Sequence, residues 1–477
     1  MIGAREKATS FWMQLGTGVL PFADAASPSL PLSRLLRLSL FQITVGMAAV
    51  LLTGTLNRVM IVELSIPAWF VALAIALPLV VAPFRALIGF RSDVYQSALG
   101  WRRVPFVWGG SLLQFGGLAI MPFALIVLSG DTHGPVLYGQ LGAAFAFLLV
   151  GAGMHITQTA GLALATDLCA EEQRPQVVSL LFVMLLVGML LSALLFGLLL
   201  QDFSQVRLIK VVQGAAMVTL ALNLVALWKQ EPLDPARNHF ADGKSPSFVA
   251  AWRTLMTDQR AARMLLALAF GTVGFAMQDV LLEPYGAQIL GMSVSATTTL
   301  TAILAGATLV AFGVAARMLR NGLDPHRLAA YGALVGVVAF TGVSLVAGLQ
   351  SANVFRVAVG MIGFGAGLFM VGTLIGCMNL ARDSGSGLAL GAWGAVQATA
   401  TGVAIALGGA LRDMISALAQ SGALGNALTN EATGYCAVYQ VEVLFLFATL
   451  AVIGPLALHA GQPVNSDSSL GLADIPS

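Results

Sequence analysis

Charged side chains are scarce in this sequence. Only 10% of its 477 residues are Asp, Glu, Lys or Arg, against about a quarter in soluble proteins, and 58% are hydrophobic. So few polar groups cannot cover the surface of a soluble protein of this length, and most of the chain is therefore expected to face lipid. The formal net charge of +2 is too small to indicate a nucleic-acid partner.

Cysteines and catalytic signatures are also rare. The three cysteines, Cys169, Cys377 and Cys436, lie far apart without metal-ligand spacing, so neither a disulfide nor a cysteine metal site is expected. The sequence contains no phosphate-binding loop, no nucleophile elbow and no pair of histidines at metal-binding spacing. We therefore predict that the protein is not an enzyme.

Long apolar runs, by contrast, are abundant. A helix needs about 20 apolar residues to cross the hydrocarbon layer, and the sequence contains twelve such runs. The 52 glycines agree with this interpretation, since small residues let membrane helices approach closely. The predicted spans are residues 35–57, 66–88, 104–129, 136–163, 176–200, 208–228, 262–282, 294–318, 328–349, 354–378, 386–410 and 436–458.

The positions of Lys and Arg predict the orientation. With the N-terminus in the cytoplasm, nineteen of the 24 basic residues fall in cytoplasmic segments and five on the opposite side. The reverse orientation would invert this bias. A multi-pass inner-membrane protein with both termini in the cytoplasm is therefore expected.

The longest hydrophilic break divides the spans six and six. Two six-helix halves joined by a cytoplasmic linker are typical of the major-facilitator plan, so we predict an all-α membrane protein with that fold. The residues before the first span form either an interfacial amphipathic segment or a disordered tail. The predicted segments are 1–33 at the N-terminus, 34–228 and 261–459 as the two halves, 229–260 as the linker and 460–477 as a cytoplasmic tail.

The loop after the second predicted span resembles the major-facilitator signature. The Asp of this signature can accept hydrogen bonds from a helix N-terminus, and its basic residues can anchor the loop at the anionic inner leaflet. The sequence departs from the pattern by the extra residues 94–99, and an ordinary positive-inside loop is the alternative interpretation. The matching residues are Gly89, Asp93, Gly100, Arg102 and Arg103.

Polar residues also follow the fourth and tenth predicted spans. Asp167 and Arg174 lie in the first of these loops, and Arg382 and Asp383 lie in the second. These side chains could form ion pairs across the cytoplasmic face and so bias the protein toward one open state. Solvated loop charge is the alternative.

His155 is the only histidine inside a predicted span. Gly151 precedes it by one turn and is expected to leave open volume above the ring, while Gln158 follows on the same face. A neutral imidazole beside such a gap suits a planar pigment whose central magnesium needs one axial ligand. The alternative is a core histidine that forms a hydrogen bond to a neighbouring helix.

Four further ionisable residues lie near the predicted outer ends of spans. Asp279 and Glu283 are four residues apart in the seventh span and could share one face, where they would bind a proton or a cation or accept structural hydrogen bonds. Pro284 is expected to end that helix. Arg58 and Glu63 flank the outer end of the first span and are expected to form a surface pair, which contributes little stability.

Several long runs closely resemble the PucC/LhaA family of purple photosynthetic bacteria. They are residues 31–42, 54–64, 84–93 and 100–105, together with 155–167 and 278–286. The resemblance extends from about residue 11 to residue 460, and the LhaA-like branch is favoured.

The resemblance implies an assembly factor for a light-harvesting antenna complex, either light-harvesting 1, which is favoured, or light-harvesting 2. Such a protein would hold or deliver bacteriochlorophyll a while antenna α and β polypeptides are built into rings in the intracytoplasmic membrane. Reaction-centre proteins, bacteriochlorophyll-synthesis proteins and membrane lipids are further implied partners. Within this resemblance, His155 is the natural magnesium ligand.

A proton-coupled secondary transporter of a small solute is the competing function. Such carriers place a titrating carboxylate near the middle of a span, whereas Asp279 and Glu283 are expected near an outer end. The apolar central halves of the spans therefore favour a hydrophobic client. A regulatory protein that acts on antenna-gene expression is a third possibility.

Overall fold

The computed structural model describes residues 30–80, 88, 92, 101–129, 135–169, 174–231, 259–380 and 386–458. Within these ranges every regular element is a helix, and each of the twelve predicted spans corresponds to helical structure. Among the described residues, eleven helices are long and apolar enough to cross a membrane. The exception is α4 (Ala68–Val80), where the predicted span continues into residues outside the described part.

Six spans come from the first part of the chain. The first span is continuous but changes in helical type, with α2 (Leu32–Leu38), α3 (Leu40–Ala49) and the π-helical η2 (Val50–Leu56) and η3 (Val59–Glu63). The five others are α4, α6 (Val104–Leu128), α7 (Val136–Leu168), α8 (Arg174–Leu199) and α9 (Gln205–Leu227).

Six more spans follow residue 258. The first of them is interrupted, with α11 (Gln259–Ala276), the 3₁₀ turn η6 (Met277–Val280) and α12 (Leu282–Leu290). The others are α13 (Val294–Arg320), α14 (Pro325–Leu349), α15 (Ala352–Leu380), α16 (Ser386–Gln420) and α17 (Ala432–Leu458).

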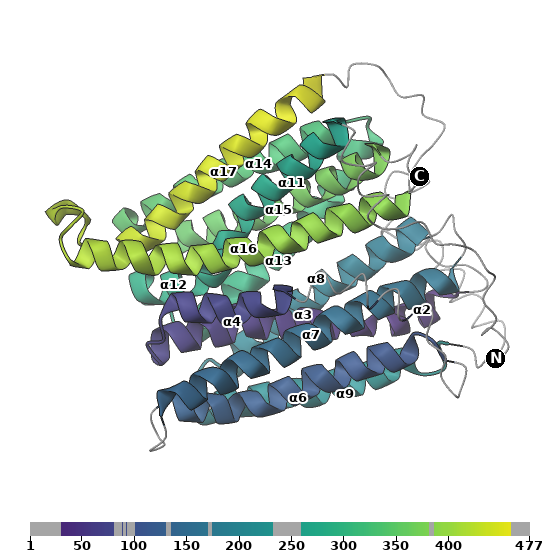
Figure 1. The fold of residues 1–477 in the computed structure, drawn as a ribbon, viewed down its shortest axis with the longest axis horizontal. Helices are drawn as coiled ribbons and strands as arrows, with labels where there is room; N and C mark the ends of the chain where they lie inside the picture. The colour runs from purple at the N-terminus through teal and green to yellow at the C-terminus, as the bar shows by residue number, and fades with distance from the viewer. Residues whose placement is uncertain are drawn as a thin grey trace.

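The helices of each half form a separate group. In Figure 1 the first half, purple to blue, lies below the second half, teal to yellow. We call the end of the bundle where α2 begins and α17 ends the inner end, and the opposite end the outer end. The predicted orientation places the inner end in the cytoplasm.

Glycines set the close approach of neighbouring helices, as expected from their abundance. In α6 and α7, an added Cβ on Gly110 would lie 2.8 Å from the Gly153 carbonyl oxygen. In α8, an added Cβ on Gly188 would lie 2.6 Å from the Ile43 Cα of α3. Because the atoms met are backbone atoms, these two helix pairs pack at distances that exclude larger residues.

Among the described residues, two helix pairs make the most extensive contacts between the two halves. Helix α4 packs on α16, where an added Cβ on Gly409 would lie 2.8 Å from the Ala68 carbonyl oxygen. Helix α8 packs on α13, where Gly197 approaches the carbonyl oxygen of Ser295. All four residues lie toward the outer end, so the halves are joined there.

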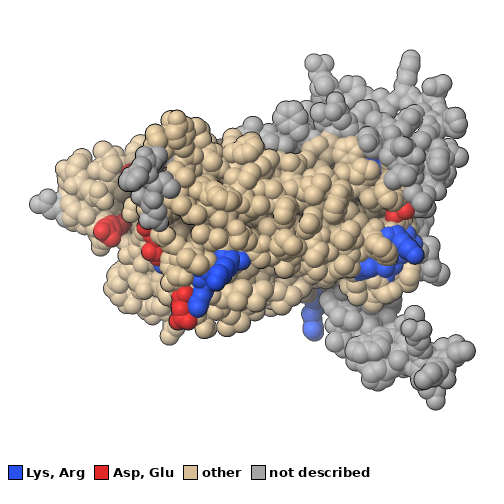
Figure 2. All heavy atoms as spheres, turned by 90° about the horizontal axis from the view of Figure 1, so that it is seen from below, with Lys and Arg blue, Asp and Glu red and all other residues tan. Residues whose placement is uncertain are grey.

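Charged side chains gather toward the ends of the bundle. Figure 2 shows one face with a broad uncharged surface between two groups of charged residues. Large apolar side chains are exposed along the helices, among them Phe123, Leu198 and Leu345. An uncharged band that exposes such side chains is what a lipid-facing surface requires, so the chain is a multi-pass membrane protein.

Candidate functional site

The seventh span is broken where the two halves meet. Helix α11 ends at Ala276, a 3₁₀ turn covers Met277–Val280, and α12 restarts at Leu282. The prediction that Pro284 ends the helix is wrong, because Pro284 lies in the first turn of α12, where its missing N–H has no intrahelical partner to lose. The break therefore lies before the proline.

The first span of the other half is also irregular at the same level. Its π-helical segment η2 lies beside η6, and Asn57 Nδ2 donates to the Val280 carbonyl oxygen at 2.9 Å. Nearby, the hydroxyl oxygens of Thr55 and Thr298 lie 3.4 Å apart. The leading helix of each half is thus irregular, π-helical in the first half and broken in the second, and such irregularities are frequent at functional sites.

Glu283 lies in this contact and is buried, with 2% of its surface exposed. Its Oε1 accepts from Thr301 Oγ1 at 2.6 Å, and the Thr297 hydroxyl is also close to the carboxylate. The carboxylate rests over Gly54, where an added Cβ would lie 2.5 Å from Oε1. The predicted position near an outer end is therefore wrong for Glu283, because α12 continues beyond it and α13 covers it.

Arg58 and Glu63 form the ion pair that the sequence predicts, with Nη1 and Oε1 2.5 Å apart. The pair is not a surface pair, because the Arg58 side chain is 5% exposed and that of Glu63 is 39% exposed. Arg58 Nη2 also approaches the Met292 carbonyl oxygen at 3.4 Å, and the guanidinium interacts electrostatically with Glu283. Arg58 therefore connects an exposed carboxylate with a buried one.

Glu442 is the site residue that sequence reasoning missed. It is fully buried, its Oε1 accepts from the Gln278 backbone N–H at 2.6 Å, and its Oε2 has no partner. The predicted span began at residue 436, but α17 begins at Ala432. Glu442 consequently lies about 15 Å inside the helix. Extending the apolar run upstream to Ala432 would have revealed this.

Asp279 and Glu283 were predicted to share one helix face, but in the structure they do not. The 3₁₀ turn separates them, and Asp279 Oδ1 accepts from Gln278 Nε2 and interacts with Glu442, whereas Glu283 interacts with Thr301 and Arg58. The two carboxylates therefore belong to two adjacent polar clusters on either side of the break.

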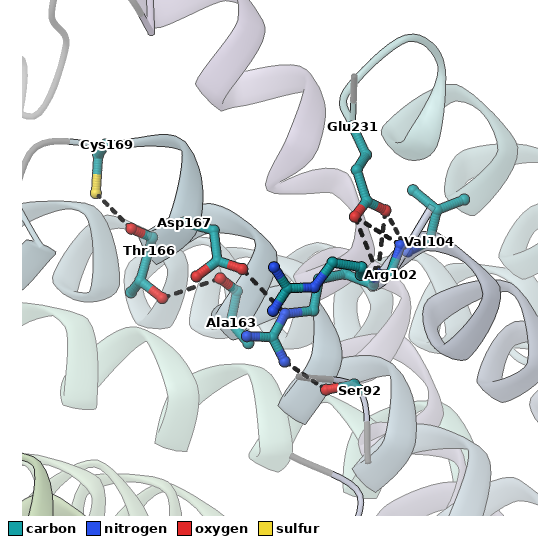
Figure 3. Close-up of polar contacts among 9 residues, drawn as sticks. Ser92, Arg102, Val104, Ala163, Thr166, Asp167, Cys169 and Glu231 are labelled. Carbon is teal, nitrogen blue, oxygen red and sulfur yellow. Dashed lines mark hydrogen bonds and ion pairs between the residues drawn. The ribbon is translucent and has the colours of Figure 1, made fainter. Parts of the chain in front are cut away.

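A second polar network lies at the inner end of the first half. Figure 3 shows the Glu231 carboxylate accepting from the backbone N–H groups at the start of α6, with distances of 2.8 Å from Arg102 and 2.9 Å from Val104. A carboxylate at a helix N-terminus satisfies its free N–H groups and opposes the helix dipole. Glu231 thus fixes the end of the first half to its third span.

Arg103 links this network to the fourth span. Its Nε donates to Asp167 Oδ2 at 3.0 Å, and its Nη1 donates to Ser92 Oγ. Of the predicted motif residues, Arg102, Arg103 and Asp167 are thus brought together, within one half and not between halves. The Arg174 backbone begins α8, while its side chain and the residues Gly89, Asp93, Gly100, Arg382 and Asp383 lie outside what the structure describes.

A cavity of about 1310 Å³ lies beside this network. It is larger than most small-molecule sites, which measure about 300–1000 Å³. Residues of α2, α6, α7 and α9 line it, and Asp167 and Glu231 belong to its wall. Its lining also includes three tryptophans and three basic residues, namely Trp101, Trp108, Trp228, Arg34, Arg37 and Lys229.

The structure places His155 on α7, outside the lining of this cavity. His155 and Gln158 are half-buried, and each interacts with a neighbouring residue. The open volume expected at Gly151 is absent, because an added Cβ there would overlap the Pro78 ring of α4. The space left by the missing side chain of Gly151 is thus filled by a residue of α4. Magnesium ligation by His155 remains a prediction.

Solved transporter structures share the fold. A bacterial homologue of the human lysosomal transporter Spinster, inward-facing and unoccupied, matches with a TM-score of 0.65 at 15% identity, over 94% of this chain and 100% of that chain. A peptide transporter of the POT type matches with a TM-score of 0.64 at 13% identity, over 89% of this chain and 94% of that chain. At these identities the likeness concerns the fold alone, which is major-facilitator-like as predicted.

Sequence relatives identify the family. Protein PucC of Rhodovulum sulfidophilum is 58% identical over 406 residues, 84% of this chain and 89% of that protein. A Rhodobacter capsulatus protein described as uncharacterized and from the puhA-bchM intergenic region is 54% identical over 462 residues, 96% of this chain and 97% of that protein. The model of the family described as PUCC protein matches residues 55–460, and the chain therefore belongs to the PUCC protein family.

Proposed function

We propose that this protein is a non-catalytic assembly factor for a bacterial light-harvesting antenna complex, and that it holds or delivers bacteriochlorophyll a to the antenna α and β polypeptides. The observation that carries the proposal is the family match over residues 55–460, since PUCC proteins are associated with light-harvesting complex assembly. The resemblance to the LhaA-like branch favours the light-harvesting 1 ring over light-harvesting 2 as the client.

The geometry of the inner-end cavity supports a pigment client. Trp101, Trp108 and Trp228 offer flat indole surfaces, against which a planar macrocycle can stack. Tryptophans are also favoured at the boundary between lipid and water, where an amphiphilic pigment would be handed over. We propose this cavity as a pigment-binding region.

His155 remains the proposed magnesium ligand, although it does not line the cavity. Its environment fits ligation only in part, because the space at Gly151 is filled by Pro78 and His155 already has an interaction partner. A magnesium ligand at His155 and a stacking surface in the cavity would constitute two separate pigment positions. Substituting His155 and a cavity tryptophan in separate variants shows how much pigment each position binds.

The test is extraction in mild detergent followed by an absorption spectrum and identification of co-purified polypeptides. Bound bacteriochlorophyll together with light-harvesting 1 polypeptides is the expected result, and light-harvesting 2 polypeptides would reassign the client. Trp108→Ala should reduce bound pigment, whereas Trp69→Ala, an exposed tryptophan at the outer end of α4, should not. A colourless preparation without antenna polypeptides would refute the proposal.

His155 needs two substitutions because it already has a neighbour. His155→Ala should lower the pigment content, and His155→Gln, which keeps hydrogen bonding but is a poor magnesium ligand, should lower it equally. Full recovery with Gln would assign His155 a structural role.

Proton-coupled transport is the second candidate, and the buried carboxylates beside the irregular first and seventh spans favour it. Glu283 and Glu442 are buried inside spans, whereas Glu283 was expected near an outer end. Reconstitution into liposomes with an imposed pH gradient tests it. A colourless protein with gradient-dependent uptake would support this function over the first.

A further inference from the structure

Unpartnered polar atoms gather beside the break in the seventh span. In the described part of the chain, Gln278 Oε1, Tyr439 Oη and Glu442 Oε2 are buried and have no hydrogen-bond partner. Tyr439 precedes Glu442 by one turn of α17 and interacts with it electrostatically. A buried carboxylate oxygen without a partner is costly, so its presence indicates a missing donor.

The site has an excess of acceptors. Its described amide donors, the Gln278 N–H and the Gln278 side-chain NH₂, already donate to Glu442, to Asp279 and to the Phe275 carbonyl oxygen. The two acceptors that are left, Gln278 Oε1 and Glu442 Oε2, have only the single O–H of Tyr439 between them. One added hydrogen on a carboxyl oxygen would convert an unmatched acceptor into a donor.

Charge leads to the same conclusion. Glu442 interacts electrostatically with Asp279, a group of the same sign. Two carboxylates that share a buried site cannot both be ionised without a compensating cation. A metal ion is not supported, because no group of three His, Cys, Asp or Glu residues in the described ranges could hold one.

The helices packed against Glu442 bring their cations only at their ends. The elements in contact with α17 are α11, α12, α14, α16 and η6. Arg412, near the outer end of α16, is already bonded to Asp413, Gln288 and Tyr435. The remaining ionisable groups of these elements and of α17 are Arg260 and Arg263 on α11, Asp279 on η6, Glu283 and Tyr285 on α12, His326, Arg327 and Tyr331 on α14, Asp413 on α16, and Tyr435, Cys436 and Tyr439 on α17.

We propose that Glu442 and Asp279 form a proton-binding site at the break in the seventh span, and that its occupancy controls the contact between the two halves. On release, the O–H bond of the carboxyl group breaks, its electron pair stays on the oxygen, and the proton passes to water. The proposal does not depend on the antenna role.

The link to the halves runs through the 3₁₀ turn. Glu442 accepts from the Gln278 N–H, and two residues later the Val280 carbonyl accepts from Asn57 of the first half. Loss of the proton leaves two negative charges across this turn. Their repulsion is relieved by movement of α17 relative to η6 or by entry of water, and either change weakens the Asn57 contact that joins the halves.

Infrared spectroscopy of the purified full-length protein tests the proton directly. The wild type should show, at neutral pH, the carbonyl stretch of a protonated carboxylic acid, which shifts in heavy water. Glu442→Gln should remove this band, and Glu431→Gln, an exposed glutamate just before α17, should keep it. Asp279→Asn removes the neighbouring charge and should move the loss of the band to lower pH. A wild-type spectrum without the band at neutral pH would overturn the proposal.

A second measurement works on the wild type alone and so does not depend on the folding of a variant. A hydrophobic carbodiimide reacts with protonated carboxyl groups in membrane interiors, and peptide mass spectrometry locates the adduct. Modification of Glu442 or Asp279 is expected, decreasing as the pH rises. Modification confined to exposed acids such as Glu431 would contradict the proposal.

The coupling to the halves has its own test. Spin labels at Trp69→Cys on α4 and Leu418→Cys on α16, with the free cysteines Cys169, Cys377 and Cys436 replaced by Ser in every protein compared, report the separation of the two helices near the outer end. The distance should increase with pH in the otherwise wild-type protein and stay constant when Glu442→Gln is added. A distance that is independent of pH in both proteins would refute the coupling, whatever the infrared result.

Discussion

The Glu231 cap allows the inner-end network to be tested by substitution. Glu231→Ala removes the acceptor for the first N–H groups of α6, and Glu231→Gln removes the charge while keeping one acceptor oxygen. A matched control is Glu431→Gln, which removes an exposed glutamate at the other end of the protein. The three variants separate charge, hydrogen bonding and the general effect of losing an acid.

The structure sets the size of the expected effect. Loss of a helix N-cap costs about 0.5–2 kcal/mol, and a negative charge near the helix N-terminus adds about 0.3–1 kcal/mol. The freed N–H groups lie next to a large cavity and can bind water, so no full burial penalty is added. We therefore expect Glu231→Ala to lower the free energy of unfolding by about 1–3 kcal/mol and Glu231→Gln to lower it by less.

Thermal unfolding in mild detergent, followed by tryptophan fluorescence, is the assay. The difference between Glu231→Ala and wild type should shrink as salt is added, because the charge contribution is screened. A midpoint for Glu231→Ala equal to that of the wild type would show that water replaces the carboxylate without cost, and the cap argument would then fail. An equally large loss in Glu431→Gln would show that the effect is not specific.

Three further predictions concern packing, charge and pH, each measured by the same unfolding assay. Gly188→Val should cost about 1–3 kcal/mol or more because its side chain would meet the α3 backbone, whereas Gly214→Ala, with open space around the added methyl group, should be neutral or slightly stabilising. Arg58→Met leaves the buried Glu283 without its cation and should lower the free energy of unfolding by about 3–5 kcal/mol. Glu63→Gln changes the more exposed partner and should lower it by about 1 kcal/mol. Equal losses would contradict the assignment of Arg58 as the buried member of the pair. Burial raises the pKa of Asp324, but the side chain of His326 and the backbone N–H groups of His326 and Arg327 outweigh burial and lower the pKa overall. The contribution of Asp324 to stability is therefore present at neutral pH and is lost as the pH falls below about 4. Asp324→Asn should consequently have a smaller loss of stability in acid than the wild type.

The twelve spans could be predicted because the information is local. A run of apolar residues long enough to cross the membrane needs no knowledge of its neighbours, and each run corresponds to helical structure. The pair of Arg58 and Glu63 was predictable for the same reason, since the two residues lie five positions apart near one helix end.

The polar site at the break could not be predicted in this way. The contact between Glu442 and the Gln278 backbone joins residues 164 positions apart, so only the packing of α17 on the broken span reveals it. The space at Gly151 was misjudged for a similar reason, because the residue that fills it, Pro78, comes from a different helix. Sequence periodicity assigns residues to a face but does not identify what covers that face.

The inner-end contacts have a consequence for synthesis of the chain. Gln230 and Glu231 directly follow the sixth span. Arg34, near the start of the first span, donates to Gln230, and Glu231 accepts from the N-terminus of the third span. These contacts connect the sixth span to the first and third. All partners in these contacts have been translated once residue 231 has emerged. The first six helices can therefore reach their final arrangement in the membrane while the ribosome is still adding the second six.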